Sequence, residues 1–269
     1  MSTVEDTRGI LNPYQGFRRF DLSRHEPSAD LQPWVDRYWV VRWDLGPGER
    51  YEQEVLPHPS VQLAFEAHCA TVHGVGTHRF VARLEGAGRV LGVKFLPGAF
   101  TAFSARPMVD LVDRVLPLGD VFGEPARAVA EQVVAEPDVA VAIECIEQLL
   151  SSLAPRRDPD AELVARLVAF VRGERSVTRS GALARHAGMS VRSLQRLFER
   201  HLGLGPKWII CRARVQEAAD RVAAGQAIDW AGLAVELGYH DQAHLIHEFK
   251  AQVGFTPAAY AARCAAAER

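Results

Sequence analysis

The sequence predicts an α+β protein in two parts, an N-terminal antiparallel β domain with helices and an all-α C-terminal domain. Three observations predict it. Short segments with a two-residue period precede residue 97, a helical repeat follows residue 182, and a charged, proline-broken stretch lies between them. That stretch, SSLAPRRDPD, is the expected boundary. The chain of 269 residues, 48% of them hydrophobic, is long enough for two cores. We therefore place the domains at residues 1–154 and 160–265.

The first domain is expected to be a β meander that forms a small sheet or a partial barrel. Its strand candidates are short, rich in β-branched or aromatic residues and separated by glycine and proline; they are residues 34–44, 50–56, 61–66, 70–75, 78–84 and 88–96. The segments HGVGTH and EGAGRVLG are interpreted as hairpin turns, because neither carries the lysine and hydroxyl residue of a phosphate-binding loop. Apolar residues at helical spacing predict an amphipathic helix over 139–153.

The second domain contains one unit twice. The stretch from Leu183 to Pro206 recurs from Leu233 to Pro257, with matching residues first 50 and then 51 positions apart. The matched pairs are Leu183/Leu233, Ala184/Ala234, Gly188/Gly238, Leu194/Leu245, Phe198/Phe249, Gly203/Gly254 and Pro206/Pro257. Each unit has the order helix, glycine turn, helix, which is the layout of a helix-turn-helix DNA reader. We expect the units over 181–202 and 229–252, joined by one helix over 206–223.

The second helix of the first unit carries an apolar stripe on one side and a polar face on another. The stripe consists of Leu194, Leu197, Phe198 and Leu202. The polar face carries Arg192, Gln195, Arg196 and Glu199. Ser190 and Asp241 stand where the N-caps of the two second helices belong. The polar face is therefore expected to lie in solvent, where it can meet DNA.

The charge distribution also indicates DNA as the partner. Residues 172–214 hold ten basic side chains against two acidic ones, a local balance of +8 in a chain whose net charge is −2. The basic residues are Arg172, Arg175, Arg179, Arg185, Arg192, Arg196, Arg200, Lys207, Arg212 and Arg214. Such a run is often only a solvated helix face. Because it coincides with the face expected to be exposed, we interpret it as a surface for DNA phosphates.

At this point the residues resemble a known family. The segment LAVELGYHDQAHLIHEFKAQVGFTPAAY resembles the C-terminal signature of the AraC/XylS family of bacterial transcription regulators, and LARHAGMSVRSLQRLFERHLGLGPKWI matches it as the first copy. The resemblance covers roughly residues 160–262. It implies a double helix-turn-helix domain that binds double-stranded DNA and regulates transcription. It also implies RNA polymerase as a further partner, and a small-molecule effector and a homodimer as options.

The resemblance also implies which side chains meet DNA. The base-contacting positions are Arg192, Ser193, Gln195, Arg196, Gln242, Ala243, His244, Ile246 and His247. The phosphate-contacting positions are Ser190, Arg200, Lys207, Asp241, Lys250 and Thr256. Arginine pairs bidentately with guanine and glutamine with adenine, so the first unit has suitable readers. The second unit departs from the pattern, because the family often has arginine at His247 and a small polar residue at Ile246. Ile246 can touch a thymine methyl group or belong to the core.

The segments VDRYWVVRW, VLPHPSVQLAFE and GRVLGVKFLPGAF resemble the sensor region of uncharacterised AraC-type regulators, some of them cupin-like. This implies a ligand-sensing or dimerisation domain. Candidate pocket residues are Trp39, Trp43, Tyr51 and Phe65, which can equally fill the core. The histidines His58, His68, His73 and His78 form no HxH motif, so neither a metal centre nor any other cofactor is predicted.

Two further function classes stay open. One is a β-barrel metal-dependent enzyme fused to a DNA-binding module, although no catalytic residues are identified, and the other is an architectural DNA binder. The four cysteines form no CxxC pair, which favours a reducing compartment over a disulfide framework or a zinc site. No apolar run reaches 18 residues and no signal-peptide pattern begins the chain, so a cytoplasmic protein without a membrane role is expected.

Overall fold

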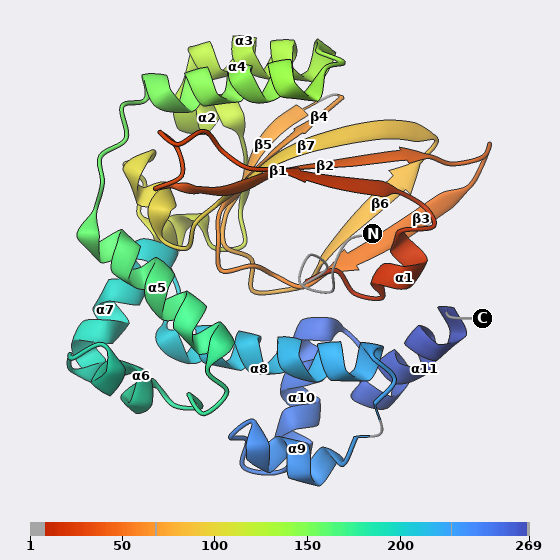
Figure 1. Cartoon of the computed structure of the whole chain (residues 1–269), viewed down its shortest axis with the longest axis vertical. Coiled ribbons are helices and arrows are strands. Elements are labelled where there is room, and N and C mark those ends of the chain that lie inside the picture. Colours follow the sequence, from red (N-terminus) through yellow and green to blue (C-terminus); the bar gives the residue numbers. More distant parts are fainter. Residues whose placement is uncertain (1–8, 68, 227, 268–269) are drawn as a thin grey trace.

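The computed structural model describes residues 9–67, 69–226 and 228–267. Two antiparallel sheets form the β domain (Figure 1). The larger has the strand order β1 (Asp21–His25), β2 (Val35–Asp44), β7 (Ala87–Phe95), β4 (Gln62–Glu66), β5 (Cys69–His73) and β8 (Val115–Pro117). The smaller pairs β3 (Arg50–Val55) with β6 (Phe80–Glu85). His68, one of the histidines weighed as a metal ligand, lies outside the described residues.

The core of the β domain lies between the larger sheet and a pair of helices. Its largest fully buried side chains include Tyr38, Phe95 and Phe100. The short helices of this region are α1 (Pro13–Gly16), η2 (Ala99–Ala102), η3 (Met108–Leu111) and α2 (Leu118–Phe122). The longer α3 (Glu124–Ala135) and α4 (Val139–Ser152) cover one side of the sheet (Figure 1) and bury their apolar faces in the same core.

All remaining helices belong to the C-terminal part, which lies along the opposite side of the β domain (Figure 1). They are α5 (Pro159–Gly173), α6 (Ser180–His186), α7 (Val191–Leu202), α8 (Pro206–Ala223), α9 (Trp230–Glu236), α10 (Gln242–Val253) and α11 (Pro257–Ala267). The predicted order, an antiparallel β domain followed by an all-helical region, is confirmed. None of the described helices combines the length and hydropathy that a bilayer span requires.

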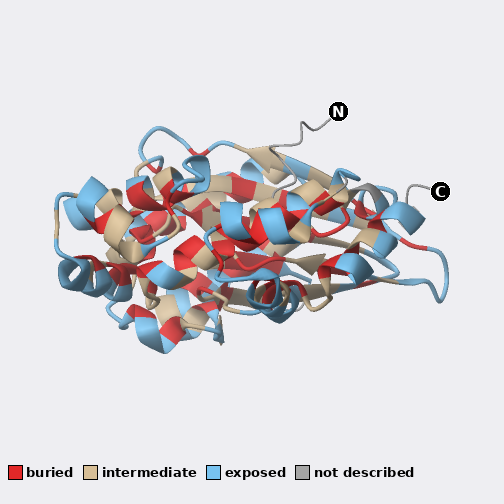
Figure 2. Ribbon diagram, turned by 90° about the horizontal axis from the view of Figure 1, so that it is seen from below, coloured by how far each residue is buried: buried red, intermediate tan, exposed pale blue. Residues whose placement is uncertain are grey.

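The helical part has two cores, one for each unit of the repeat. Leu183, Leu194 and Phe198 lie in the first, with residues of α5 and α8. The second core contains Leu245 and Phe249, and it also includes Leu11 and Leu56 from the β domain. The second unit is therefore completed by residues that lie far away in the sequence. In the ribbon coloured by burial, buried residues lie on the inward sides of the helices and exposed residues along their outer sides (Figure 2).

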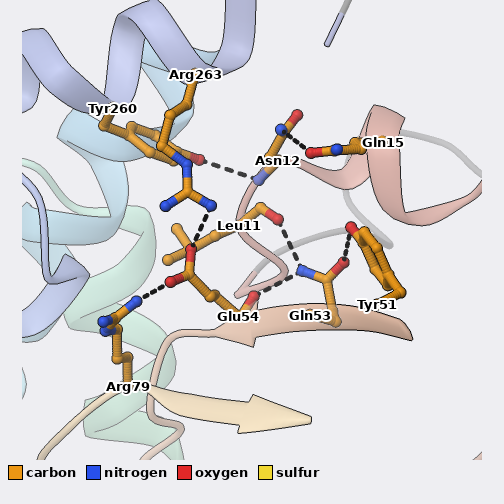
Figure 3. A network of polar contacts seen from close by, with 9 residues as sticks. All are labelled: Leu11, Asn12, Gln15, Tyr51, Gln53, Glu54, Arg79, Tyr260 and Arg263. Carbon is orange, nitrogen blue, oxygen red and sulfur yellow. Dashed lines mark hydrogen bonds and ion pairs between the residues drawn. The ribbon is translucent and has the colours of Figure 1, made fainter. Parts of the chain in front are cut away.

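Polar contacts reinforce this junction between the β domain and the second unit (Figure 3). The Glu54 carboxylate at the end of β3 pairs with the guanidinium groups of Arg79 and, at 3.2 Å, Arg263 of α11. Both guanidinium groups lie over the ring of Phe255. The backbone N–H of Asn12 donates to the Tyr260 hydroxyl at 3.3 Å. Glu54 thus ties the β domain to the last helix of the chain.

The first unit is attached to the β domain by a different contact, between the end of α7 and the short helices η2 and η3. Gly203, directly after α7, has φ +75°, and a Cβ atom there would lie 2.6 Å from the Met108 carbonyl oxygen of η3. Glycine is therefore needed both for the backbone conformation and for the close approach. His201 is fully buried beside η2, with its Nδ1 atom 3.4 Å from the Thr101 hydroxyl. Burial lowers the pKa of His201 from its ordinary value.

Candidate nucleic-acid interface

The first helix-turn-helix unit consists of α6, the turn at Gly188 and α7. Ser190 caps α7, because its hydroxyl accepts a hydrogen bond from the Ser193 backbone N–H at 3.1 Å. Leu194 and Phe198 are completely buried against α5, α6 and α8. These contacts fix the rotation of α7 about its axis, so its remaining face is turned outward. The predicted cap and apolar stripe are both present.

The outward face of α7 carries the residues expected to read bases. Arg192, Ser193, Gln195 and Arg196 are all exposed. The Gln195 amide donates to the Glu199 carboxylate at 2.8 Å, so this side chain lies along the helix. Arg200, expected at a phosphate, lies 3.7 Å from Asp160 of α5. An arginine, a glutamine and a second arginine thus stand together on one helix face, a donor and acceptor set suited to the major groove.

The second unit repeats this construction with α9, the turn at Gly238 and α10. The Asp241 carboxylate caps α10 by accepting a hydrogen bond from the His244 backbone N–H at 2.8 Å. This bond lowers the pKa of Asp241, and the neighbouring His240 contributes at 3.0 Å. Leu245 and Phe249 are fully buried. The predicted cap and anchors therefore have the expected positions here as well.

The outward face of α10 is less charged than that of α7. Gln242, Ala243, His244 and His247 are exposed, while Ile246 is half-buried. Lys250, near the C-terminal end of the helix, is exposed too. Thr256 caps α11 by accepting from the Ala259 backbone N–H at 3.3 Å, so its hydroxyl already has a structural role. One glutamine and two histidines are thus the polar groups that α10 offers to bases.

The helix α8 joins the two units, and a contact between Gly238 and Thr178 also holds them together. Gly238 has φ +77°, and a Cβ atom there would lie 2.3 Å from the Cβ atom of Thr178, just before α6. The turn of the second unit therefore touches the segment that enters the first. A cavity of about 230 Å³ lies at this contact, and its lining includes Arg179, Lys207 and His244. The charged groups of Arg179 and Lys207 at a hollow between the two units are suited to a DNA phosphate.

Two arginines of the basic run have another role. Arg214 is 2% exposed, and its Nη2 atom donates to the carbonyls of Val171 at 2.7 Å and Glu174 at 2.9 Å. Arg212 is 6% exposed, and its Nε atom donates to the Pro57 carbonyl of the β domain. The expectation that the whole run lies on an exposed face is therefore wrong for these two residues. Arg214 satisfies backbone carbonyls at the C-terminal end of α5, and Arg212 satisfies a carbonyl in a loop of the β domain.

The aromatic residues considered for a ligand pocket do not share one cluster. Phe65 is buried in the main core of the β domain. Trp43 and Tyr51 pack against a smaller cluster of Phe20, Leu45 and Leu84. The Trp43 indole donates to the Glu85 carbonyl at 3.1 Å, and Trp39 packs over Gly92. Within the described residues these side chains have packing roles.

One group of potential metal ligands is present among the described residues. Asp158, Asp160 and His201 place oxygen or nitrogen atoms within 4.8 Å of one another. The Asp158 carboxylate is occupied as the N-cap of α5, accepting from the Asp160 backbone N–H at 2.9 Å. His201 is buried at the η2 contact described above. These residues have local structural roles where α5 and α7 meet the β domain.

Comparison with known proteins matches the two parts of the chain separately. Residues 23–117 match a family model described as a domain of unknown function (DUF6597), and residues 183–263 match a helix-turn-helix domain. An uncharacterised HTH-type transcriptional regulator of Haemophilus influenzae is 30% identical over 101 residues, which are 38% of this chain and 34% of that protein. The chain thus spans about a third of the length of this curated relative.

Two solved structures are also similar. The DNA-binding domain of AdpA, a global transcriptional factor solved in complex with a target DNA, is 31% identical. The match covers 41% of this chain and 96% of that one, with a TM-score of 0.32. ToxT from Vibrio cholerae, bound to (E)-4-(8-methylnaphthalen-1-yl)but-3-enoic acid, is 11% identical over 91% of this chain and 99% of that one, with a TM-score of 0.40.

Proposed function

We propose that this chain, whose C-terminal part is an AraC-type helix-turn-helix domain, is a transcription regulator that reads DNA sequence with both units. The observation that carries the proposal is the pair of outward helix faces on α7 and α10. Each is fixed by a side-chain cap and two buried anchors, and each presents hydrogen-bonding groups at its N-terminal end. Preorganised polar groups on a rigid helix are what major-groove readout requires.

The residue roles follow from this placement. Arg192, Gln195 and Arg196 of α7 are assigned to base edges, together with Gln242 and His244 of α10. Lys207 and Arg179 are assigned to a phosphate at the cavity between the units, because no acidic residue is among its lining. Ser190 and Asp241 contribute their helix caps. Under this proposal the chain acts by binding, and no catalytic step is assigned to it.

We also propose that residues 1–154 form a regulatory domain and residues 160–265 the DNA-binding domain. The recognition faces of α7 and α10 are exposed, although the β domain contacts both units. The β domain therefore leaves the recognition faces of α7 and α10 exposed. It acts on the position of the two units relative to each other. A ligand that changed the junction would change the spacing of the two readers, and that is a route to control.

A selection experiment tests the proposed function. Random double-stranded DNA is selected with the purified full chain at fixed salt, and the enriched sites are footprinted. Sequence-specific regulation predicts one enriched motif that competes far better than bulk DNA. An enriched pool without a motif, bound no better than bulk DNA, would identify an architectural binder and contradict the proposal.

A further inference from the structure

His201, in the last turn of α7, has one ring nitrogen without a hydrogen-bond partner. Its side chain is 1% exposed, and its Nε2 atom makes no hydrogen bond to any residue that the structure describes. Such a buried polar atom is rare, because losing its water costs free energy that a partner normally offsets. The role of His201 as a packing residue beside η2 leaves this nitrogen unexplained.

The contacts on the other side of the ring show which nitrogen carries the proton. The Thr101 hydroxyl donates to the Gly98 carbonyl at 3.0 Å, so at 3.4 Å from His201 Nδ1 it is placed to accept from the ring. The Gly98 carbonyl also acts on the ring as a hydrogen-bond acceptor. In the neutral imidazole these acceptors place the proton on Nδ1 and leave a lone pair on Nε2. A buried Nε2 lone pair is suited to a metal ion.

The Nε2 lone pair faces carboxylates instead of a donor. Asp158 Oδ2 lies 3.9 Å from His201 Nε2, which is too long for a hydrogen bond. Asp160 adds a carboxylate oxygen, and the three ligand atoms lie within 4.8 Å of one another. Acceptors that face each other repel unless a cation lies between them. An ion with bonds of roughly 2.1 Å holds neighbouring ligand atoms about 3–4 Å apart, so a rotation of the exposed Asp160 side chain is enough to complete the set.

Asp158 caps α5 with only one of its two oxygens. Its Oδ1 atom accepts from the Asp160 backbone N–H at 2.9 Å, whereas its Oδ2 atom is the one near His201. The N-terminal end of α5 carries positive partial charge, and the end of α7, where His201 lies, carries negative partial charge. Because these dipole ends oppose each other, the side-chain charges decide which ion the site favours.

The charged groups that act on His201 are Asp158, Asp160 and Arg200. Arg200 Nη1 lies 3.7 Å from Asp160 Oδ2, and the arginine side chain is 69% exposed, so it can turn into solvent. The two carboxylates then balance the charge of a divalent cation. Both carboxylate side chains are partly exposed, which gives an ion access and allows water to complete its coordination.

We propose that Asp158, Asp160 and His201, the α5–α7 metal triad, bind a divalent transition-metal ion, with Zn²⁺ as the best fit. Zinc accepts imidazole nitrogen together with carboxylate oxygen and keeps a position for water, whereas Mg²⁺ and Ca²⁺ prefer oxygen ligands. Thr101 and the Gly98 carbonyl hold the far ring nitrogen, as partners of metal-bound histidines do.

The bound ion would tie the last turn of the first recognition helix to the start of α5, at the place where both meet the β domain. An effect of the ion on DNA binding rests on the proposed function, whereas binding of the ion does not.

Titration of the full chain with Co²⁺, followed by displacement with Zn²⁺, tests the α5–α7 metal triad. The visible absorption of bound Co²⁺ reports its ligands, and wild type should show one saturable equivalent. D158N should bind at least roughly tenfold more weakly, although asparagine keeps the helix cap. D138N is the matched control and should bind like wild type, because Asp138 caps α4 in the same way, accepting from the Ala140 backbone N–H at 2.8 Å.

R200Q gives a change of the opposite sign. Loss of the guanidinium group beside Asp160 should tighten ion binding by roughly fivefold at low salt, because a positive charge near the ion is removed. Weaker ion binding in R200Q would contradict the placement of the ion at Asp160.

Equal ion affinities of wild type and D158N would overturn the proposal. So would the absence of a saturable equivalent in wild type, the result expected if His201 is protonated and pairs with Asp158. If D158N does not fold, D160N carries the test, since Asp160 is exposed. DNA binding is measured on the same samples. Ion binding without sequence-specific DNA binding would contradict the proposed function and leave the triad standing, whereas sequence-specific DNA binding without ion binding would do the reverse.

Discussion

At the scale of single residues, burial decides what each arginine does. Arg192 and Arg196 are exposed on α7 and are assigned to bases. A bidentate arginine–guanine pair contributes roughly 1–3 kcal/mol of discrimination. We therefore expect R192A or R196A to weaken binding to the selected motif and to relax preference at one or two base pairs. A matrix of variant and single-base-pair affinities at fixed salt measures this.

Two further variants in the same affinity measurements distinguish base contacts from positioning and phosphate contacts. H247A should weaken binding less and more evenly across sequences, as loss of a positioning contact does. K207A should chiefly lower the salt dependence, by about one unit of slope if the lysine meets a phosphate. R83A, at a β6 side chain that is 78% exposed, is the control. A larger change of base preference in H247A than in R196A would show that α10 is the main reader.

Lys94 gives a pH dependence with a definite sign. Its pKa is about 8 in the folded chain and roughly 10.4 when unfolded. Between these values the unfolded chain binds more protons, so the free energy of unfolding rises with pH, by about 3 kcal/mol in all. K94M should lack this rise. Chemical denaturation of both proteins from pH 7 to 10.5 measures the difference, and parallel curves would contradict the assigned burial of the charged amine.

Some of these residue roles were predictable from the sequence and others were not. Ser190 and Asp241 were recognisable as caps because a cap depends on neighbouring residues only. The sequence could not show that Arg212 and Arg214 are buried while other arginines of the run are exposed. Their burial depends on contacts with the β-domain loop and with the end of α5. Local pattern carries no information about such distant partners. The base contacts themselves remain predictions.

At the scale of elements, the repeat made the helices predictable. Matching glycine and apolar residues in the two copies indicated α6, α7, α9 and α10, the segment 206–223 between the copies indicated α8, and these helices are present. Strands β1 and β8 were not anticipated. β1 is a polar edge strand, DLSRH, and β8 has three residues ending in proline, so neither shows the alternation by which strands are recognised. Their place is set by pairing with β2 and β5.

The contact between the two turns gives a prediction with a matched control. Gly188 and Gly238 both have positive φ, but a Cβ atom at Gly188 meets nothing within 4 Å. G188A should cost about 1–2 kcal/mol for the left-handed backbone alone. G238A should cost a further 1–3 kcal/mol or so, because its methyl group would displace Thr178. Urea unfolding of both variants compares the costs, and T178G should restore part of the loss in G238A.

Equal costs in the two glycine variants would contradict the packing of the second turn against the segment before α6. DNA affinity provides a second readout, because this contact fixes the spacing of the readers. G238A with T178G should recover affinity together with stability.

At the scale of the whole molecule, the β domain contacts the helical units at two separate places. Gly203 and His201 attach the first unit, and Leu11, Leu56 and Glu54 attach the second. The sequence predicted two domains but not this junction, since it joins residues as far apart as Asn12 and Tyr260. No short-range pattern encodes a contact of that separation.

The junction predicts a local loss of stability in E54Q. The neutral amide cannot neutralise Arg79 and Arg263, so α11 should detach more readily from the β domain. Hydrogen exchange should accelerate in α10 and α11 and stay unchanged in α7. E52Q is the matched control, because Glu52 lies on the same strand with a side chain that is 61% exposed. Equal exchange in both variants would show that Glu54 does not hold the second unit.

If one chain reads DNA with two helix-turn-helix units, both units should protect DNA. A hydroxyl-radical footprint of the full chain on its selected site, repeated with Q242A/H244A, measures this protection. Two units on one face predict two protected regions about one helical turn, roughly 34 Å, apart, with the second region lost in the double variant. A single protected region of about six base pairs, identical for wild type and the double variant, would contradict the claim.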